Sequence, residues 1–369
     1  MNLVDAADMN PKEKRAAPGC QVPEEIVVEI LSRLPVKSLC RFKCVCKVWY
    51  NLISDTRFVK MQLNQSIKSR RGRCVLHESM PFHHRFQLDY ESLFSGHEVK
   101  LVEEDPLFCL KTIDRFQIQV WGSCNGLLCT YVFPGTVVLV NPSTRQTKTI
   151  LSIHCPENKP KPLFGGFLIF DGFGFGYDAL HDDYKVVLIS NRNIFDVYSL
   201  KSSAWRRIGY LCRDETTRMK RDSVHINGGI YWITYFESEP TLSITAFYLS
   251  KQEFTKISTP VSQADYPCVK LHSMGGNLCI GKHLPPLYEF WVIKIYGKKY
   301  SWEKTVSTFP CQSSPTLLDF PKSEEALIIS DGGLLIYNNR DKTQRRVNFK
   351  QISTYVIFGF SYVESLVSL

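Results

Sequence analysis

The sequence lacks the features that would assign the chain to a membrane or to the secretory pathway. None of its 369 residues belongs to a stretch that approaches the roughly 20 apolar residues of a membrane span. The first twenty residues, MNLVDAADMNPKEKRAAPGC, lack the apolar core of a signal peptide. We therefore predict a short disordered tail over residues 1–20 and no membrane partner, and we expect the protein in the nucleus, the cytoplasm or both.

Paired metal-binding cysteines are also missing. The 13 cysteines are dispersed and odd in number. Neither a C-x-x-C pair nor a matching set of histidines accompanies the cluster of Cys40, Cys44 and Cys46. In a reducing compartment, cysteines of this kind are small buried hydrophobic residues. We expect no metal ion and no cofactor.

Charge of one sign is only modestly in excess, with 45 basic against 36 acidic residues and a formal net charge of +9. The densest basic run is Lys68, Arg70, Arg71 and Arg73, and we interpret residues 66–73 as a solvated basic linker. A weak nuclear-import signal and a contact for an acidic partner are the alternatives for this run. Aromatic residues do not alternate with the basic ones as a stacking platform needs, so nucleic acid is not an expected partner.

The stretch from Val22 to Leu63 has the spacing of short helices. Pro23 suits a first helical position, and two acidic residues follow it in the first turn. Pro35 ends this helix, because the residue before a proline resists the α conformation, and it can also begin the next one. A third segment follows, and Asp55 is the type of residue that caps a last short helix.

These segments predict a small three-helix bundle with more apolar residues than its core can hold. The expected core consists of Leu39, Phe42, Val45, Trp49, Leu52 and Ile53. The surplus consists of Val22, Pro23, Ile26, Ile30, Leu34 and Pro35. An exposed apolar patch of this kind marks a partner. Packing of the surplus against the rest of the chain is the alternative.

This stretch resembles the F-box of plant proteins. The matching residues occur in the family's order: Pro23, Ile30-Leu31, Arg33-Leu34-Pro35, Leu39, Arg41-Phe42-Lys43, Val45-Cys46-Lys47, Trp49, Leu52-Ile53 and Phe58. The resemblance implies that residues 21–65 are an F-box that docks a Skp-type adaptor, which is bound in turn to a cullin and a RING protein. The adaptor-binding residues would be Pro23, Ile26, Ile30, Leu31, Leu34, Pro35 and Leu39.

After the bundle, short β-rich runs separated by turn residues replace the helical spacing, which predicts a mainly β fold. Similar turns precede a strand at Asn125-Gly126, Asn227-Gly228, Gly275-Gly276 and Asp331-Gly332. The starts of these repeat units recur about every 45 to 55 residues, which is the length of a four-stranded propeller blade. We therefore predict one closed β-propeller over residues 74–369.

The last predicted strand indicates that the propeller ring is closed. Phe358, Phe360 and Tyr362 within Tyr355 to Val363 need a second sheet to bury them, and an open edge would invite aggregation. We predict that this strand pairs with the first β stretch after the bundle, at Cys74 to His77 or Phe86 to Tyr90. The alternative is that the tail covers the face of one blade.

The β region resembles the plant F-box-associated domain, which is kelch-like, and it is also similar to the S-locus F-box group. The matching segments are Trp121 to Leu127, Asn141 to Thr144, Phe173 to Asp178, Asp183 to Val187 and Tyr362 to Leu366. The resemblance implies a domain that binds a substrate protein.

Signatures of catalysis are weak. Gly172, Gly174 and Gly176 spell G-x-G-x-G, but no helical segment follows, so we interpret them as part of a blade strand and not as a phosphate cradle. The segments His83-His84 and His181-Asp182-Asp183 are better explained as turns than as metal ligands, because adjacent strand residues point to opposite faces. No residue stands out as a nucleophile, and we expect no enzyme.

Three hypotheses on function remain. The first is a non-catalytic substrate receptor of an SCF-type ubiquitin ligase, which raises the effective concentration of a substrate near the charged enzyme. The second is an F-box scaffold outside a ligase, and the third is a ligand-binding propeller. Blade-connecting loops are the candidate substrate-binding segments: Ile153 to Phe170, Cys212 to Asp222, Val261 to Lys270, Lys282 to Glu289 and Thr308 to Pro315.

Overall fold

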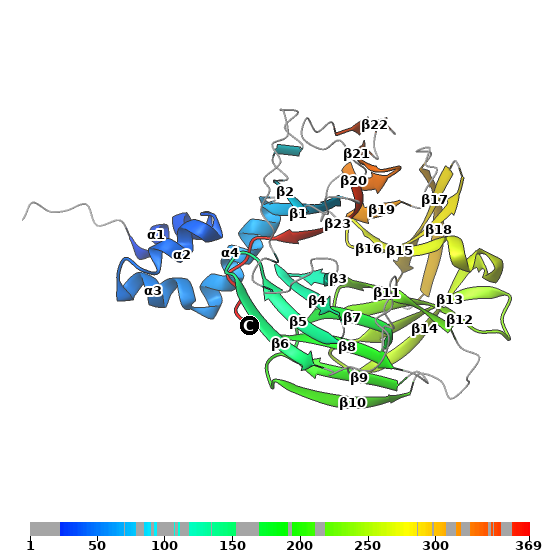
Figure 1. The fold of residues 1–369 in the computed structure, drawn as a ribbon, viewed down its shortest axis with the longest axis horizontal. Helices are drawn as coiled ribbons and strands as arrows, with labels where there is room; N and C mark the ends of the chain where they lie inside the picture. The colour runs from blue at the N-terminus through cyan, green and yellow to red at the C-terminus, as the bar shows by residue number, and fades with distance from the viewer. Residues whose placement is uncertain are drawn as a thin grey trace, which may run out of the picture.

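The computed structural model shows a helical bundle followed by a ring of β-sheets (Figure 1). It describes residues 23–69, 71–78, 85–89, 92–93, 107, 110, 118–133, 135–152, 170–190, 194–210, 218–285, 287–296, 299–307, 315–318, 325–338, 341, 343–347 and 356–369. The predicted tail over residues 1–20 and the pair His83-His84 lie outside these residues. None of the described helices has the length and apolar character that a membrane span needs.

Four helices form the bundle: α1 (Glu24–Ser32), α2 (Val36–Phe42), α3 (Lys47–Ser54) and α4 (Thr56–Lys68). The predicted cap of the last helix is confirmed, because the Asp55 side chain accepts hydrogen bonds from the backbone N–H groups of Arg57 (2.8 Å) and Phe58 (3.2 Å). This helix is 13 residues long and not short. The bundle therefore has a fourth full helix.

The predicted linker over residues 66–73 is wrong at both ends. Helix α4 continues to Lys68, with Ser66 fully buried, and the first strand already begins at Gly72. Basic residues do not end a helix, because a positive charge in the last turn is favourable to the helix dipole. Residues 69–71 therefore separate α4 from β1 in the sequence.

Six sheets make up the β domain in the described part of the chain, five of four strands and one of three. The three-stranded sheet contains β1 (Gly72–Glu78), β2 (Arg85–Asp89) and β23 (Val356–Val363). The next two sheets contain β3 (Ile118–Cys124), β4 (Leu127–Val132), β5 (Thr136–Asn141) and β6 (Gln146–Ser152), then β7 (Phe170–Asp178), β8 (Asp183–Ser190), β9 (Ile194–Ser199) and β10 (Ala204–Tyr210).

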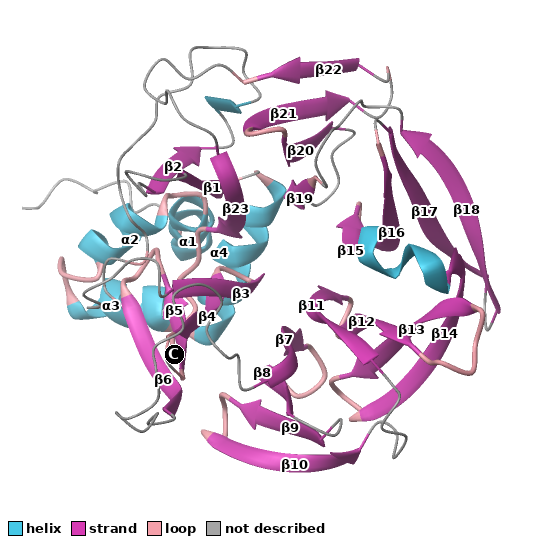
Figure 2. Ribbon diagram, turned by 45° about the vertical axis from the view of Figure 1, so that its right-hand side comes forward, coloured by secondary structure: helices cyan, strands magenta, loops and turns pink. Residues whose placement is uncertain are grey.

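The other three sheets follow in chain order. They contain β11 (Arg218–Ile226), β12 (Gly229–Tyr235), β13 (Thr241–Tyr248) and β14 (Glu253–Ser262); β15 (Val269–Met274), β16 (Asn277–Leu284), β17 (Leu287–Tyr296) and β18 (Lys299–Ser307); and β19 (Thr316–Leu318), β20 (Glu325–Ser330), β21 (Gly333–Asn338) and β22 (Thr343–Arg346). A 3₁₀ helix, η2 (Gln263–Cys268), connects β14 to β15. Figure 2 shows β3, β7, β11, β15, β19 and β23 around the centre of the ring.

The last strand closes this ring as predicted. β23 pairs antiparallel with β1, from Gly72 opposite Val363 to Glu78 opposite Val356. β2 pairs with the other edge of β1, so the three-stranded blade combines both ends of the β domain. Tyr362 is 6% exposed in the core that this blade shares with the sheet of β3. The tail is therefore the innermost strand of a blade and not a cover on its face.

The G-x-G-x-G segment lies in β7, an inner strand, as the sequence indicated. Its glycines permit close packing of β7 on β11 and β12. A Cβ at Gly174 would lie 2.6 Å from the Ile230 side chain, and a Cβ at Gly176 would overlap the ring of His225. The motif is explained by packing between blades and not by a phosphate ligand.

The ring has two faces, because the antiparallel strands of each blade turn alternately at one end and at the other. Helix α4 leads into β1 on the face where β23 ends, and the Asn125-Gly126 turn lies there too, against Val363 and Ser365. The Asn227 side chain donates to the Gly276 carbonyl oxygen (3.4 Å), which places these two turns on the same face. We call it the bundle face. The Asp331-Gly332 turn is not equivalent, because it joins the second and third strands of its blade.

Candidate functional site

The core of the bundle corrects part of the expected adaptor surface. Leu31 and Leu39 are 3% and 0% exposed and pack with Val36, Ile53 and Phe58. The prediction that these two leucines contact the adaptor at the surface is wrong. Their helical positions turn inward and they fill the centre of the bundle.

Exposed apolar residues nevertheless remain on the bundle. Ile26 and Ile30, which share one face of α1, are 50% and 54% exposed. Pro23 and Pro35 are also exposed, and Leu34 is half-buried. These five residues stay the predicted adaptor contacts.

The expected bundle core also needs one correction. Ile53 is buried, and Phe42, Trp49 and Leu52 are half-buried against the core, with the rings of Phe42 and Trp49 edge to face at 5.1 Å. Val45, in contrast, is 64% exposed. Helix α2 ends at Phe42, so the spacing of three that linked Val45 to it no longer describes a helical face.

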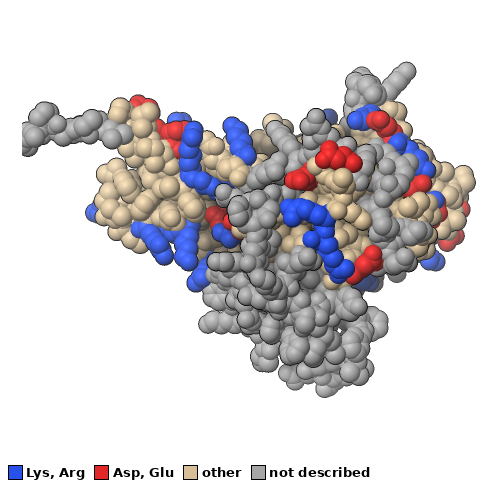
Figure 3. Space-filling view, turned by 90° about the horizontal axis from the view of Figure 1, so that it is seen from above, with Lys and Arg blue, Asp and Glu red and all other residues tan. Residues whose placement is uncertain are grey.

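Two exposed apolar residues were missed by the sequence analysis. Val48 and Tyr50, at the start of α3, are 70% and 54% exposed. Five of the ten large apolar side chains that are exposed in the described residues belong to this bundle: Ile26, Ile30, Val45, Val48 and Tyr50. In Figure 3 the outer end of the bundle, at the left, is a broad surface with few charged side chains and with Lys and Arg at its borders. Such a concentration is typical of a protein-docking surface.

The C-terminal segment, Glu364 to Leu369, joins the bundle to the ring. Leu366 is 4% exposed and belongs to the core of the bundle, whereas Val367 and Leu369 pack against the core between the second and third sheets. The Glu364 carboxylate accepts two hydrogen bonds from the Arg73 guanidinium (2.7 and 3.1 Å). The other oxygen of this carboxylate accepts a bond from the N–H of Val36 (3.4 Å) at the start of α2.

A buried asparagine holds the C-terminal segment from the propeller side. The Asn141 amide nitrogen donates to the carbonyl oxygens of Ser365 (3.0 Å) and Val367 (2.7 Å). The amide oxygen of the same residue accepts from the N–H groups of Ser143 and Thr144. Two segments noted in the sequence, Asn141 to Thr144 and Tyr362 to Leu366, therefore meet at one site.

An ion pair adds a second contact between the bundle and the ring. Lys60 of α4 lies 2.7 Å from Asp182, in the turn between β7 and β8. The hydrogen bond from Lys60 lowers the pKa of Asp182, which also accepts a bond from the Tyr177 hydroxyl. Both charged groups are nearly half exposed, so solvent screening leaves this pair a small part of the junction.

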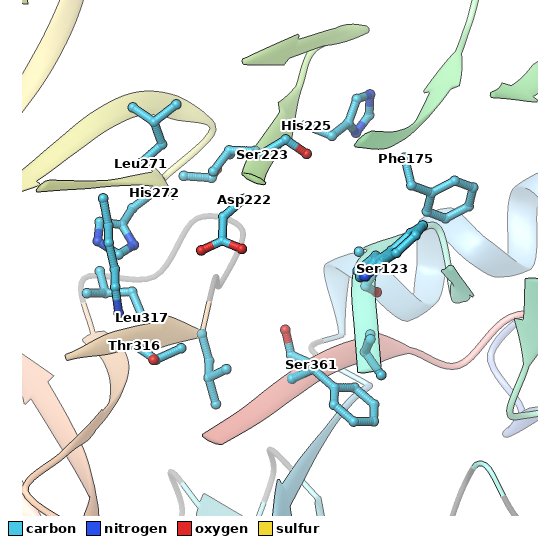
Figure 4. Close-up of a pocket in the computed structure, with 18 of the residues that line it drawn as sticks. Ser123, Phe175, Asp222, Ser223, His225, Leu271, His272, Thr316, Leu317 and Ser361 are labelled. Carbon is cyan, nitrogen blue, oxygen red and sulfur yellow. The ribbon is translucent and has the colours of Figure 1, made fainter. Parts of the chain in front are cut away.

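A central cavity of about 400 Å³ lies inside the ring, lined by side chains of the inner strands (Figure 4). Burial lowers the pKa of His225 to about 4 and that of His272 to about 3, so both rings are neutral at physiological pH. The His225 ring accepts a hydrogen bond from the N–H of Tyr177 (3.3 Å), and the His272 ring shares one with the Tyr288 hydroxyl (2.8 Å). These histidines therefore act as buried hydrogen-bonding groups.

The candidate substrate loops belong to the face opposite the bundle. Four of them connect the outer strand of one blade to the inner strand of the next: Ile153 to Phe170, Cys212 to Asp222, Val261 to Lys270 and Thr308 to Pro315. Most of the first and last, and the first half of the second, lie outside the described residues. We call this the loop face.

Three loop boundaries are corrected. Residues Arg218 to Asp222 belong to β11, and Gln263 to Cys268 form η2. The segment Lys282 to Glu289 is wrong as a connection between blades, because it is the hairpin between β16 and β17 within one sheet. It still lies on the loop face, since second-to-third strand turns share the end at which blades connect.

The described residues contain no group of three His, Cys, Asp or Glu side chains that could hold a metal ion. The three clustered cysteines of the bundle differ in exposure: Cys40 is half-buried, and Cys44 and Cys46 are exposed. Burial raises the pKa of Cys40.

Residues 20–61 match the F-box domain, and residues 78–369 match the F-box associated beta propeller domain. The chain is an F-box protein. The F-box match covers α1 to α3 and the start of α4, and the propeller match covers most of the ring.

Similar proteins agree with this family. The chain is 30% identical to the F-box/kelch-repeat protein At3g23880 of Arabidopsis thaliana over 86% of this chain and 87% of that protein. It is also 30% identical to the F-box protein At5g49610 of Arabidopsis thaliana, over 70% of this chain and 68% of that one. Among solved structures, TolB from Acinetobacter baumannii has a TM-score of 0.45 and 11% identity, covering 83% of this chain and 73% of that chain.

Proposed function

We propose that this F-box protein is the substrate-recognition subunit of an SCF-type ubiquitin ligase. The observation that carries the proposal is the number of exposed apolar side chains on the bundle: Ile26, Ile30, Val45, Val48 and Tyr50. A Skp-type adaptor would cover this surface and link the chain to a cullin and a RING protein. The loop face, at the other end of the ring, would bind a substrate protein for ubiquitination and degradation by the proteasome.

The junction suits such a receptor because it fixes the two surfaces relative to each other. Leu366 inserts into the bundle while Asn141 holds the same segment on the ring. A receptor of this kind performs no chemistry itself. It raises the effective concentration of substrate lysines near the ubiquitin-charged enzyme, and a rigid junction preserves that gain. We place this activity in the nucleus, the cytoplasm or both.

The alternatives predict a different fate for the bound protein. An F-box scaffold outside a ligase would bind the adaptor and leave the lifetime of its partner unchanged. A ligand-binding propeller would carry a small molecule in the central cavity through purification. The lifetime of bound proteins separates these hypotheses.

Affinity purification from plant cells, with and without a proteasome inhibitor, tests the proposal. We expect a set of proteins to co-purify with the wild-type chain only when the proteasome is inhibited. The variant with Ile30→Asp and Val48→Asp should retain the same proteins without inhibitor, because it binds substrate and cannot deliver it. If these proteins co-purify equally under all conditions, the protein is a scaffold and not a ligase receptor.

A further inference from the structure

The strands β11 and β15 bring basic side chains to the loop-face end of the central cavity. Lys220 and Lys270 line the cavity, and Arg218 and Arg221 lie beside Lys220 on β11. Each is within the first four residues of its strand, at the end remote from the turns of the bundle face. We call these four residues the basic mouth.

The backbone of β11 is irregular at this point. Its pairing with β12 shifts between Met219 and Ser223, so that Lys220, Arg221 and Asp222 stand opposite a single residue. Bulges of this kind redirect side chains and recur beside binding sites. In Figure 4, Asp222 and Ser223 of this segment border the open space of the cavity.

Asp222 offsets one of the four positive charges of the mouth, because its carboxylate acts on both Lys220 and Lys270. Asp222 is the one acidic residue on these two strands in the described structure. Acidic residues on neighbouring segments already have basic partners: Asp265 pairs with Lys282 and Glu289 pairs with Lys304, each at 2.7 Å. The four cations of the mouth form no ion pair within the described residues.

Burial makes the two cavity lysines receptive to an anion. Loss of solvent lowers the pKa of both Lys220 and Lys270, so an added negative charge would stabilise their protonated forms. Lys220 is held in place, with Nζ 2.5 Å from the Val269 carbonyl oxygen and 5.0 Å from the centre of the Tyr266 ring. A positioned lysine loses little freedom on binding.

Five inner strands each present one hydroxyl side chain to the cavity: Ser123, Ser223, Ser273, Thr316 and Ser361. Hydroxyl groups donate hydrogen bonds to carboxylates. A volume of about 400 Å³ is in the range of a pocket for a small group, and it is too small for a folded domain. The cavity therefore fits one or a few acidic side chains of an extended segment.

We propose that the basic mouth binds an acidic peptide segment of the protein that this receptor recruits. The proposal rests on the proposed function and names the chemical class of its substrate. An extended peptide carrying Asp or Glu fits the mouth better than a nucleic acid, because Tyr266 is the one aromatic ring that a cation of the mouth contacts within the described residues, and a single ring is no stacking platform.

Fluorescence anisotropy with the full chain bound to its adaptor tests the proposal. The probe is a short labelled peptide of alternating Glu and Ser, and its counterpart has Gln in place of Glu. We expect the Glu peptide to bind at least about tenfold more tightly, with an affinity that falls as salt is raised. Equal affinity for the two peptides would overturn the proposal.

Variants locate the binding. Lys220→Gln with Lys270→Gln should weaken Glu-peptide binding by about tenfold or more. Arg218→Gln with Arg221→Gln should also weaken it, and these exposed side chains can be changed without disturbing the core. The matched control is Arg206→Gln with Lys251→Gln, which removes the same charge from exposed positions elsewhere and should leave affinity unchanged.

The remaining outcomes separate competing explanations. If both mouth variants bind the Glu peptide as the wild type does, the mouth is not the site. If a single-stranded oligonucleotide binds more tightly than the Glu peptide and the same variants lose it, the site recognises nucleic acid and the proposal fails. Capture of the adaptor, measured on the same samples, reports on the proposed function independently of the peptide.

Discussion

Removing residues 356–369 should abolish cooperative folding of the whole propeller. This deletion takes away β23, the inner strand that pairs with β1 over its full length and contacts β3 and β19. It exposes the edge of β1 and the core around Val75 and Leu128, and it removes Leu366 from the bundle. Because the ring then has no closing strand, the blades that begin with β3 and β19 each lose a neighbour, and we expect the loss to spread from them through the other blades.

Thermal and urea unfolding of the purified full chain and of the truncated chain measure this effect. The truncated chain should show no cooperative transition, and a synthetic peptide of residues 355–369 added in trans should restore part of it. Ser368→Ala, an exposed substitution in the same segment, is the control and should unfold like the wild type. A truncated chain that melts at the wild-type temperature contradicts ring closure as the source of stability.

Leu366→Asp should release the F-box bundle from the propeller. Leu366 is buried among Leu31, Val36 and Leu39, and a carboxylate there has no basic partner among the described residues of that core. Loss of the leucine side chain alone costs about 2–5 kcal/mol. Burial of an unpaired charge adds to that cost. We therefore expect the bundle to lose its fixed packing while the ring stays folded.

Hydrogen exchange resolves this effect by element. Amides of α1 to α4 should exchange much faster in Leu366→Asp, while amides of the inner strands β7 and β11 should keep their protection. Ser368→Asp adds the same charge two residues away at an exposed position and should change neither set. Unchanged protection of the helices in Leu366→Asp would show that the bundle does not depend on the C-terminal segment.

The ring could be predicted from the sequence because its signals are local and repeated. Glycine turns at regular intervals indicated the blades, and the aromatic residues of the last strand, such as Phe360 and Tyr362, required a second sheet. The number and order of the strands were harder to predict from the sequence. The Asp331-Gly332 turn looks like the other glycine turns in sequence, but it joins a different pair of strands within its blade.

The errors in the bundle arise where a helix ends or where a distant segment intervenes. Val45 follows the end of α2, so helical spacing assigned it to a core that it does not enter. The contribution of Leu366 was missed because a six-residue tail has no period to read. The hydrogen bonds from Asn141 to the carbonyl oxygens of Ser365 and Val367 join segments more than 200 residues apart, a contact that no local pattern predicts.

The most direct test of the account is capture of a Skp-type adaptor by the purified full chain, measured by isothermal titration calorimetry. The wild type should form a one-to-one complex, and Ile30→Asp with Val48→Asp should weaken it by about a hundredfold or more, because exposed apolar anchors dominate such interfaces. Leu180→Asp, at a propeller turn where the side chain is 77% exposed, is the matched control and should bind like the wild type. Undiminished capture by the bundle variant, or no capture by the wild type, would contradict the assignment of this surface as the adaptor site.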